Sequence, residues 1–456
     1  MAIRKLLVAN RGEIAVRIIR SAREMGINTI QVYSDADADM PAVSMADEAL
    51  NIGRPQAARS YLNREAILEA ARATGADAVH PGYGFLAEDA DFADAVEGAG
   101  LRFVGPSGKT IRQMGDKARA RTLALRAGLP TVPGSTGPID SVEAGLAIAG
   151  EIVYPVMIKA VGGGGGRGIR TVANPKEFSR QAPQARAEAR AAFGDDALYI
   201  EKVIDSACHI EVQILADGEC AIHLFERECS LQRRRQKVWE EAPSVNMPQE
   251  NRDELCAAAV KLAKAVNYRG AGTVEFLYDR QTGQYYFIEM NTRIQVEHPV
   301  TEMVTGIDLV REMLSIAAGR PLEISQQDVA TRGHSIEVRL NAEDPARNFL
   351  PCPGIVESLN IPNGPGVRFD GAIYPGYIIP PFYDSLLGKL VVWNIDRETA
   401  LARLARALDE FKLVGVSTTS SLFRRLVDDE DIRAGRFDTG WLEKWLREAY
   451  PEAGAL

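Results

Sequence analysis

A β-hairpin is predicted by Val274-Glu275-Phe276-Leu277-Tyr278 and Tyr285-Tyr286-Phe287-Ile288-Glu289, two runs of β-branched and aromatic residues on either side of a turn. Folding the hairpin about position 282 places Glu275 opposite Glu289, although a loop of this length also permits a slip of one residue. Opposed carboxylates repel each other in a sheet. A divalent cation between them removes the repulsion, and oxygen ligands favour Mg²⁺ or Mn²⁺ carried with a nucleotide.

The second run continues into an alternating polar sequence, Glu289-Met290-Asn291-Thr292-Arg293-Ile294-Gln295-Val296-Glu297. If the backbone is extended, the period of two places the five polar groups at odd positions on one face. A solvated strand face has the same pattern, so alternation alone does not separate a binding site from a surface strand. The opposed pair of Glu275 and Glu289 favours the binding site.

Five consecutive glycines, residues 162–166, lie between two predicted strands, Pro155-Val156-Met157-Ile158-Lys159 and Ile169-Arg170-Thr171-Val172. The P-loop pattern GxxxxGK[ST] running into a helix is absent here. We predict a hairpin tip whose backbone N–H groups approach a polyphosphate closely, with Lys159 as a charge for phosphate. The alternative is a flexible loop without function, but five glycines cost conformational entropy that a plain hairpin does not require. A phosphate-binding hairpin beside a pair of carboxylates that binds a metal ion indicates phosphoryl transfer.

The first third of the chain alternates short apolar strands with amphipathic helices. This βαβ pattern predicts a parallel sheet covered by helices, with ligands at the carboxyl ends of the strands. No GxGxxG follows the first strand, which argues against a dinucleotide site. We expect strands at 6–9, 27–33 and 78–80, helices at 12–25, 65–73, 250–266 and 307–318, a linker at 128–134, and a mostly helical tail at 396–449.

The chain has 456 residues, 53 of them basic and 62 acidic, so its formal net charge is −9. The length corresponds to roughly three domains. The acidic balance argues against a nucleic-acid binder. Arg233-Arg234-Arg235-Gln236-Lys237 is the only dense basic run, and in an extended strand its Arg233, Arg235 and Lys237 would share a face suited to small anions.

The cysteines have no CxxC spacing, so we expect neither a zinc site nor a disulfide framework, but buried free thiols in a reducing compartment. No apolar run approaches the ~18–20 residues of a membrane span, and the first apolar run is shorter than a signal-peptide core of about 7–15 residues. We therefore expect a cytoplasmic protein with no membrane or nucleic-acid partner. The five cysteines are Cys208, Cys220, Cys229, Cys256 and Cys352.

Over residues 1–445 the chain resembles the biotin carboxylase family of ATP-grasp enzymes. The resemblance implies an α/β fold with an N-terminal Rossmann-like βαβ domain at 1–130, a mobile lid at 131–204, and a catalytic and C-terminal mixed α/β part at 205–449. The segments that resemble the family are Ala9-Asn10-Arg11-Gly12-Glu13-Ile14-Ala15, His80-Pro81-Gly82-Tyr83-Gly84-Phe85-Leu86, Met114-Gly115-Asp116-Lys117, the glycine loop from Lys159 to Gly168, His209-Ile210-Glu211, Gln232 to Lys237 with Glu240-Glu241, Phe287 to Glu302, and Arg339 with Asn341-Ala342-Glu343-Asp344-Pro345.

The resemblance implies two-step chemistry in an ATP-dependent ligase. ATP phosphorylates bicarbonate to carboxyphosphate, and the released CO₂ is captured by N1 of biotin. By similarity, Glu297 is the general base, and Arg339 stabilises the biotin enolate while Tyr83 packs on biotin. The remaining implied roles are phosphate binding by Lys117, Lys159, Gly164, Gly165, Gly166 and His209; adenine-side binding by Glu201 and Lys202; nucleotide contact by Gln232; metal binding by Glu275, Glu289 and Asn291; and bicarbonate binding by Lys237, Arg293, Gln295 and Val296.

Two positions depart from the family pattern. Arg235 stands where the family usually has a histidine that contacts the ribose, and Cys208 replaces a common arginine. Both departures concern nucleotide affinity rather than the metal, bicarbonate or base residues. They are also consistent with a different function, that of an inactive nucleotide-binding partner subunit. A further alternative is another ATP-grasp ligase, one that joins a carboxylate to an amine, because such an enzyme would share the glycine loop and the metal-binding carboxylates.

The resemblance also implies partners. No methionine neighbours a lysine, so the family's Met-Lys-Met biotin site is missing, and we expect biotin to arrive on a separate carrier protein that also serves a carboxyltransferase subunit. A homodimer is expected from the family alone. The final carboxyl acceptor, such as acetyl-CoA, propionyl-CoA, pyruvate or another acid, is not identified by any of these residues.

Overall fold

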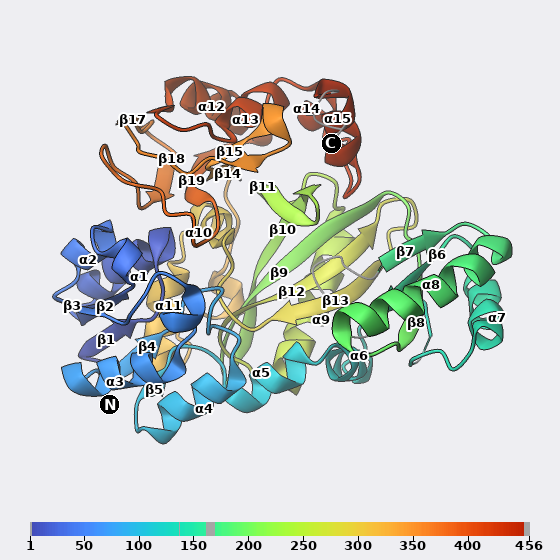
Figure 1. Cartoon of the computed structure of the whole chain (residues 1–456), viewed down its shortest axis with the longest axis horizontal. Helices are drawn as coiled ribbons and strands as arrows, with labels where there is room; N and C mark the ends of the chain where they lie inside the picture. The colour runs from blue at the N-terminus through green and yellow to red at the C-terminus, as the bar shows by residue number, and fades with distance from the viewer. Residues whose placement is uncertain (1, 136, 161–168, 451–456) are drawn as a thin grey trace.

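A computed structural model describes residues 2–135, 137–160 and 169–450. The N-terminal part is a parallel five-stranded sheet, ordered β3-β2-β1-β4-β5, with helices on its faces (Figure 1). The βαβ prediction is confirmed. The elements are β1 (Lys5–Val8), α1 (Gly12–Glu24), β2 (Asn28–Tyr33), η1 (Asp35–Asp37), α2 (Pro41–Met45), β3 (Glu48–Asn51), η2 (Ala57–Arg59), α3 (Arg64–Thr74), β4 (Ala78–His80), α4 (Ala90–Gly98), β5 (Arg102–Phe103) and α5 (Gly108–Gly115).

A small antiparallel sheet, which we call the small sheet, consists of β6, β7 and β8 in the order β7-β6-β8. Two helices pack against it and bury Val156, Ile158 and Phe178 in a core of its own. The predicted hairpin strands on either side of the glycine run are confirmed, while Gly164, Gly165 and Gly166 lie outside the described residues. The elements are α6 (Lys117–Arg126), which precedes the small sheet, α7 (Val142–Ile152), β6 (Val156–Ala160), β7 (Ile169–Val172), α8 (Pro175–Phe193) and β8 (Leu198–Lys202).

An eight-stranded antiparallel sheet forms the centre of the molecule, in the order β13-β12-β9-β10-β11-β14-β19-β18 (Figure 1). One face of β9 and β12 packs on α9, where Ile210, Val212 and Phe276 are buried. The opposite face carries the polar side chains described below. The elements are β9 (Ala207–Asp217), β10 (Ala221–Arg233), β11 (Gln236–Ala242), α9 (Gln249–Ala265), β12 (Arg269–Asp279), β13 (Tyr285–Asn291), α10 (His298–Thr305), α11 (Leu309–Ala317), η3 (Gln326–Asp328), β14 (His334–Asn341), β18 (Val367–Gly371) and β19 (Leu386–Asn394).

The tail is mostly helical, as predicted, and packs on β14 and β19. Trp441 and Trp445 stack with ring centroids 6.1 Å apart, and both are half-buried against this core. No helix in the described ranges is long and apolar enough to cross a membrane. The remaining elements are β15 (Glu343–Asp344), η4 (Pro345–Arg347), β16 (Leu350–Pro351), β17 (Ser358–Asn360), α12 (Arg397–Glu410), β20 (Lys412–Val414), α13 (Ser420–Leu426), α14 (Glu430–Arg433) and α15 (Trp441–Ala449).

All five cysteines are free thiols, but the expectation that all are buried is wrong for two of them. Cys208, Cys229 and Cys256 are buried within strands or helices, whereas Cys220 is exposed in the turn between β9 and β10 and Cys352 is partly exposed. The two that are not buried, Cys220 and Cys352, both lie outside helices and long strands.

Candidate active site

A row of charged side chains crosses four neighbouring strands of the large sheet. Arg227 of β10 lies opposite Glu211 of β9. Glu275 of β12 lies opposite both Glu211 and Glu289 of β13, so the predicted pairing of Glu275 with Glu289 is confirmed. A β-bulge between Glu275 and Phe276 accommodates the shift in register toward the turn. Because directly paired residues point to one face of a sheet, three carboxylates and one guanidinium share this face.

Lys237 of β11 lies over this row and offsets part of its negative charge. Its Nζ atom contacts a carboxylate oxygen of Glu211, Oε1 of Glu275 at 2.8 Å and Oε1 of Glu297 at 2.7 Å. Burial lowers the pKa of the ammonium group, but the three carboxylates outweigh burial and hold the pKa well above its usual value. Lys237 therefore remains charged. We call Arg227, Glu211, Glu275, Glu289, Lys237 and Glu297 the cleft floor.

Glu297 is held by two cations. In addition to Lys237, Arg339 of β14 donates from Nη2 to Oε2 of Glu297 at 3.0 Å, and its Nε donates to Glu240 at 2.7 Å. Burial would raise the pKa of Glu297, but Lys237 and Arg339 dominate and hold it well below the usual value. The carboxylate is therefore ionised, with both oxygens fixed in position, which is the state that a general base requires.

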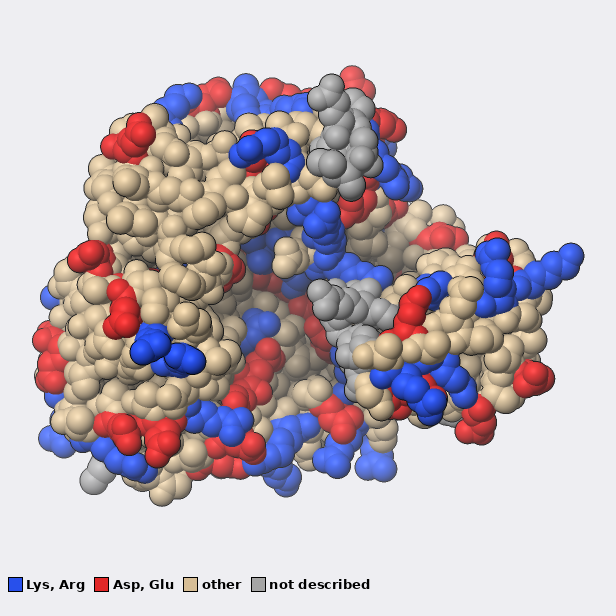
Figure 2. All heavy atoms as spheres, in the orientation of Figure 1, with Lys and Arg blue, Asp and Glu red and all other residues tan. Residues whose placement is uncertain are grey.

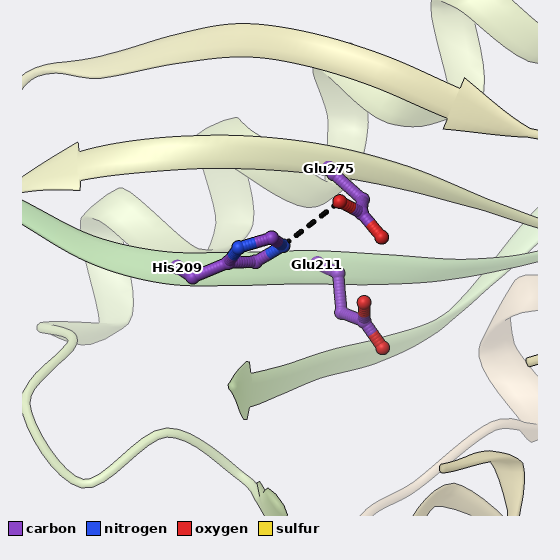
Figure 3. Close-up of side chains that lie close together, drawn as sticks. All are labelled: His209, Glu211 and Glu275. Atoms are coloured by element: carbon purple, nitrogen blue, oxygen red, sulfur yellow. Dashed lines mark ion pairs between the residues drawn. The ribbon is translucent and has the colours of Figure 1, made fainter. Parts of the chain in front are cut away.

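The residues predicted to hold a metal ion offer hard oxygen ligands on one face. Burial and the neighbouring charge of Glu275 raise the pKa of Glu289, a penalty that a divalent cation would relieve. Figure 3 shows His209 and Glu211 on β9 with Glu275 beside them, and His209 Nε2 lies 2.9 Å from Oε2 of Glu275. Asn291 donates to Oε1 of Glu275 at 2.8 Å. The oxygen donors of this face are of the kind that Mg²⁺ or Mn²⁺ prefers, and the ligand atoms of His209, Glu211 and Glu275 lie within 4.8 Å of one another.

The predicted extension of this strand to Glu297 is wrong, because β13 ends at Asn291. Glu88, from the N-terminal part, accepts the backbone N–H of Thr292 at 3.1 Å and pairs with Arg293 at 2.8 Å. The first contact occupies a backbone N–H that a strand ladder would use. Residues 292–297 form a loop that leads into α10. Arg293 and Gln295 nonetheless reach the cleft from this loop.

The prediction that Arg233, Arg235 and Lys237 share an extended face is also wrong. The basic run is the turn between β10 and β11, in which Gln232 pairs with Lys237 and Arg233 with Gln236. Arg234 and Arg235 have φ values of 47° and 65°, in the left-handed region. Only Lys237 reaches the cleft floor. Nε2 of Gln232 donates to Nδ1 of His209 at 3.0 Å, which fixes the imidazole beside Glu275.

The small sheet presents its own charges toward the cleft floor. Lys159 of β6 pairs with Glu201 of β8, and Arg121 of α6 lies 3.4 Å from the same carboxylate. Burial and the charge of Glu201 raise the pKa of the neighbouring Tyr199 to about 12. The single carboxylate of Glu201 thus contacts two cations.

Tyr83 lies at the opposite end of the cleft, on a turn held by Asn10. The amide of Asn10 donates to the carbonyl oxygens of Pro81 and Tyr83, each at 2.7 Å. Gly82 between them has φ +64°, and a Cβ atom there would lie 2.8 Å from Nδ2 of Asn10. The turn therefore requires glycine, and it directs the hydroxyl of Tyr83 onto Glu13 of α1.

These groups line one cleft with a volume of about 1130 Å³. Figure 2 shows the hollow between the C-terminal helices and the rest of the molecule, with Lys and Arg atoms along its inner wall. The predicted site residues that line it are Tyr83, Lys117, Lys159, Glu201, Lys202, His209, Gln232, Lys237, Glu275, Glu289, Asn291, Arg293, Gln295, Val296, Glu297 and Arg339.

Comparison with known families identifies the chain. Residues 2–111 match the N-terminal domain of biotin carboxylase, residues 116–325 the ATP-binding domain of the carbamoyl-phosphate synthase L chain, and residues 337–444 the biotin carboxylase C-terminal domain. The chain is 52% identical over 444 residues to biotin carboxylase of Pseudomonas aeruginosa, which covers 97% of this chain and 98% of that protein. The chain belongs to the biotin carboxylase family. Biotin carboxylase 1 of Bacillus subtilis is also 52% identical, covering 97% of this chain and 99% of that protein.

Solved structures of the biotin carboxylase family have the same fold. The biotin carboxylase domain dimer of the Hydrogenobacter thermophilus 2-oxoglutarate carboxylase, in complex with MgADP, ADP and bicarbonate, superposes with a TM-score of 0.91 at 48% identity and 98% coverage of both chains. Biotin carboxylase of Campylobacter jejuni, in a β,γ-ATP complex, superposes with a TM-score of 0.92 at 44% identity, covering 97% of this chain and 99% of that one. The ATP-grasp fold is thereby established.

The two departures from the family pattern lie in different surroundings. Cys208 is fully buried on the α9 side of β9, so the departure changes the core rather than the cleft. Burial raises the pKa of its thiol well above the usual value. Arg235 lines the cleft at its exposed turn. Only Arg235 is therefore placed to change nucleotide contacts directly.

Three residues that hold the site together were assigned no role from the sequence. Glu211, Glu240 and Glu88 bind Lys237, Arg339 and Arg293, respectively. A signal was present only for Glu211, which follows His209 by two residues in an alternating strand and must share its face. The other two contacts join segments that are 99 and 205 residues apart in the chain.

Proposed function

We propose that the chain acts as a biotin carboxylase, an ATP-dependent ligase that carboxylates biotin with bicarbonate as the first half-reaction of a biotin-dependent carboxylase. The observation that carries the proposal is the position of Glu297. This base is held by Lys237 and Arg339 in the same cleft as the Glu275–Glu289 pair. A site for phosphate activation and a base for a second substrate are thus side by side, as coupling of ATP to bicarbonate requires.

The nucleotide spans the cleft from the small sheet to the floor. Lys159, Lys117, His209 and the glycine run Gly164, Gly165 and Gly166 bind its phosphates, while Glu201, Lys202 and Gln232 bind the nucleoside side. Glu275, Glu289 and Asn291 hold Mg²⁺ or Mn²⁺, which when bound neutralises the charge of the phosphate groups.

Bicarbonate lies between the cations of the cleft floor and the loop at 292–297. Lys237, Arg293, Gln295 and the Val296 backbone orient it against Glu297. The bound anion raises the pKa of Glu297 from its low starting point, which strengthens Glu297 as a base. Glu297 then takes the bicarbonate proton, and the oxygen attacks the γ-phosphate to give carboxyphosphate and ADP.

Carboxyphosphate breaks into CO₂ and phosphate beside biotin. The released phosphate takes the proton from N1 of biotin, and N1 then attacks CO₂ to give carboxybiotin. Arg339 faces the ureido oxygen and stabilises the negative charge that develops there, an interaction that is strongest in a water-poor site. Tyr83 packs on the biotin rings at the end of the cleft opposite the small sheet.

The proposal extends to the organisation of the chain and its partners. Residues 1–130 form the N-terminal domain, 131–204 a lid whose closure excludes water from carboxyphosphate, and 205–449 the catalytic and C-terminal part. Biotin is presented by a carrier protein that also visits a carboxyltransferase subunit, and the chain works as a homodimer. The bound dimer of the Hydrogenobacter thermophilus relative supports the last point.

Steady-state ADP release by the whole chain tests this function. We expect release that depends on bicarbonate and rises when free biotin is added. Release that ignores biotin but rises with an amine would support a carboxylate–amine ligase instead. Binding of Mg-ATP without turnover would support an impaired nucleotide-binding subunit.

A further inference from the structure

A second buried cation lies beside Arg339 and has no role in the reaction described so far. Lys389 of β19 is directly opposite Arg339 of β14, so both side chains point to the same face of the sheet. Lys389 is fully buried, with no solvent-accessible surface. A buried ammonium group is retained only where its partners offset the loss of hydration, so the contacts of this lysine are informative.

Lys389 binds the residue that precedes the proposed base. Its Nζ atom donates to the backbone carbonyl oxygen of Val296 at 2.8 Å, while Arg339 holds the carboxylate of Glu297 at 3.0 Å. Two neighbouring strands thus hold two consecutive residues of the loop, one through its backbone and one through its side chain. Beyond Asn291 this loop has no ladder partner among the described residues. Side chains hold it instead, Glu88 near its start and Lys389, Arg339 and Lys237 near its end.

Lys389 also reaches the proposed biotin end of the cleft. Its Nζ atom lies 3.0 Å from Oε1 of Glu13, and the same oxygen accepts the hydroxyl of Tyr83. Glu13 is in the first turn of α1 in the N-terminal part. A continuous chain of contacts therefore joins Tyr83, Glu13, Lys389 and the carbonyl of Val296.

We propose that Lys389 is a positioning residue that fixes the Val296 carbonyl, and with it Glu297, and couples this loop through Glu13 to Tyr83. The proposal rests on the proposed function. It assigns to a buried lysine the task of setting where the base stands relative to biotin. A displacement of about 1 Å in such a group costs roughly 10²-fold in rate, so the contact has a measurable kinetic consequence.

The competing explanation is charge balance alone. Three acidic residues surround Lys389: Glu13, Asp370 and Glu337. Burial raises the pKa of Glu13, and the charge of Lys389 counteracts part of that rise. Asp370 already pairs with Arg368 at 2.6 Å. A double variant, Glu13→Gln with Lys389→Met, separates the two explanations because it restores the balance between these two charges without restoring the contact to Val296.

The test measures ADP release and biotin carboxylation for the wild-type chain, Lys389→Met, the double variant, and Lys412→Met, a matched control at an exposed lysine of β20. We expect kcat for biotin carboxylation to fall roughly 10²-fold in both Lys389 variants, with KM for ATP changed less than about twofold. The exposed control keeps wild-type values. Thermal melting shows whether Lys389→Met folds. If it does not, the kcat of the double variant tests the proposal.

Wild-type kcat in the folded double variant would overturn the proposal, since charge balance would then suffice. A wild-type chain without bicarbonate- and biotin-dependent ADP release would instead refute the proposed function. The coupling to Tyr83 has its own test, because Tyr83→Phe keeps the ring and removes only the hydroxyl. We expect Tyr83→Phe to raise KM for biotin in the wild-type background and to have little further effect in the Lys389→Met background. Additive effects would overturn the coupling.

Discussion

The cleft floor and the small sheet both present charges to the same cavity, but they hold them differently. On the floor, Lys237 contacts three buried carboxylates, and its position is determined by three strands and a loop. On the small sheet, Lys159 has one acidic partner within the part of the chain that the structure describes, Glu201, and is partly exposed. The floor is therefore organised before substrate binds, whereas the small sheet carries a cation that one ion pair restrains. We expect floor residues to control kcat and small-sheet residues to control nucleotide affinity.

The sharpest test of this difference is Glu297→Gln on the floor. The variant keeps the size of the side chain and one accepting oxygen for Lys237 or Arg339, but it cannot accept a proton. We expect biotin carboxylation to fall about 10²–10⁴-fold, with Mg-ATP binding retained. Steady-state rates and equilibrium nucleotide binding check this. Normal turnover would show that another group is the base.

Glu228 lies beneath the cleft floor, and its titration measures how much a buried charge lowers the free energy of unfolding. This fully buried carboxyl accepts from Ser230 and Ser244, and Ser230 accepts the backbone N–H of His209. Burial raises the pKa of Glu228 to about 7. Because the folded state holds its proton more tightly, stability from this group is complete below about pH 4.5 and falls as the pH rises to about 7, by about 3 kcal/mol.

Glu228→Gln removes this titration. Urea unfolding at pH 5 and pH 8 should show a loss of stability that is about 3 kcal/mol larger in the wild-type chain than in the variant. Glu219→Gln, at an exposed position in the turn after β9, serves as the control and should behave like the wild type. The same loss in Glu228→Gln and wild type would mean that Glu228 is ionised throughout.

On the small sheet, Lys159→Met should act on affinity. Loss of a charge-assisted contact to phosphate is worth about 1.5–3 kcal/mol, so we expect KM for ATP to rise roughly 10–100-fold, with a smaller change in kcat. Lys176→Met, at an exposed lysine in the first turn of α8, should leave KM for ATP unchanged. A fall in kcat as large as that of Glu297→Gln would contradict the claim that small-sheet residues control nucleotide affinity rather than kcat.

The smallest effect is expected for Arg235→His, which restores the usual family residue. Arg235 lies in an exposed turn and makes no buried ion pair among the described residues. We expect KM for ATP to change by about twofold or less. Fluorescent nucleotide titration of both proteins checks this, and a change of tenfold or more would make the turn part of the nucleotide site proper.

The extent to which sequence predicted the site depends on the range of the contacts. The pairing of Glu275 with Glu289 could be predicted because both strands belong to one hairpin, whose symmetry fixes the register. The end of β13 could not, because Glu88 binds Thr292 from 204 residues away. The turn at Arg234 and Arg235 was missed because non-glycine residues with positive φ leave little trace in the sequence. The role of Lys389 could not be predicted either, because its partners Val296 and Glu13 are distant in the sequence and meet it only in the folded chain.

The most direct measurement is the fixation of labelled bicarbonate into carboxybiotin, with the whole chain, Mg-ATP and free biotin as the acceptor. We predict that labelled carboxybiotin appears only with all three substrates and that its amount equals the ADP formed in excess of the biotin-free rate. ADP formed under these conditions without any labelled carboxybiotin would contradict the account.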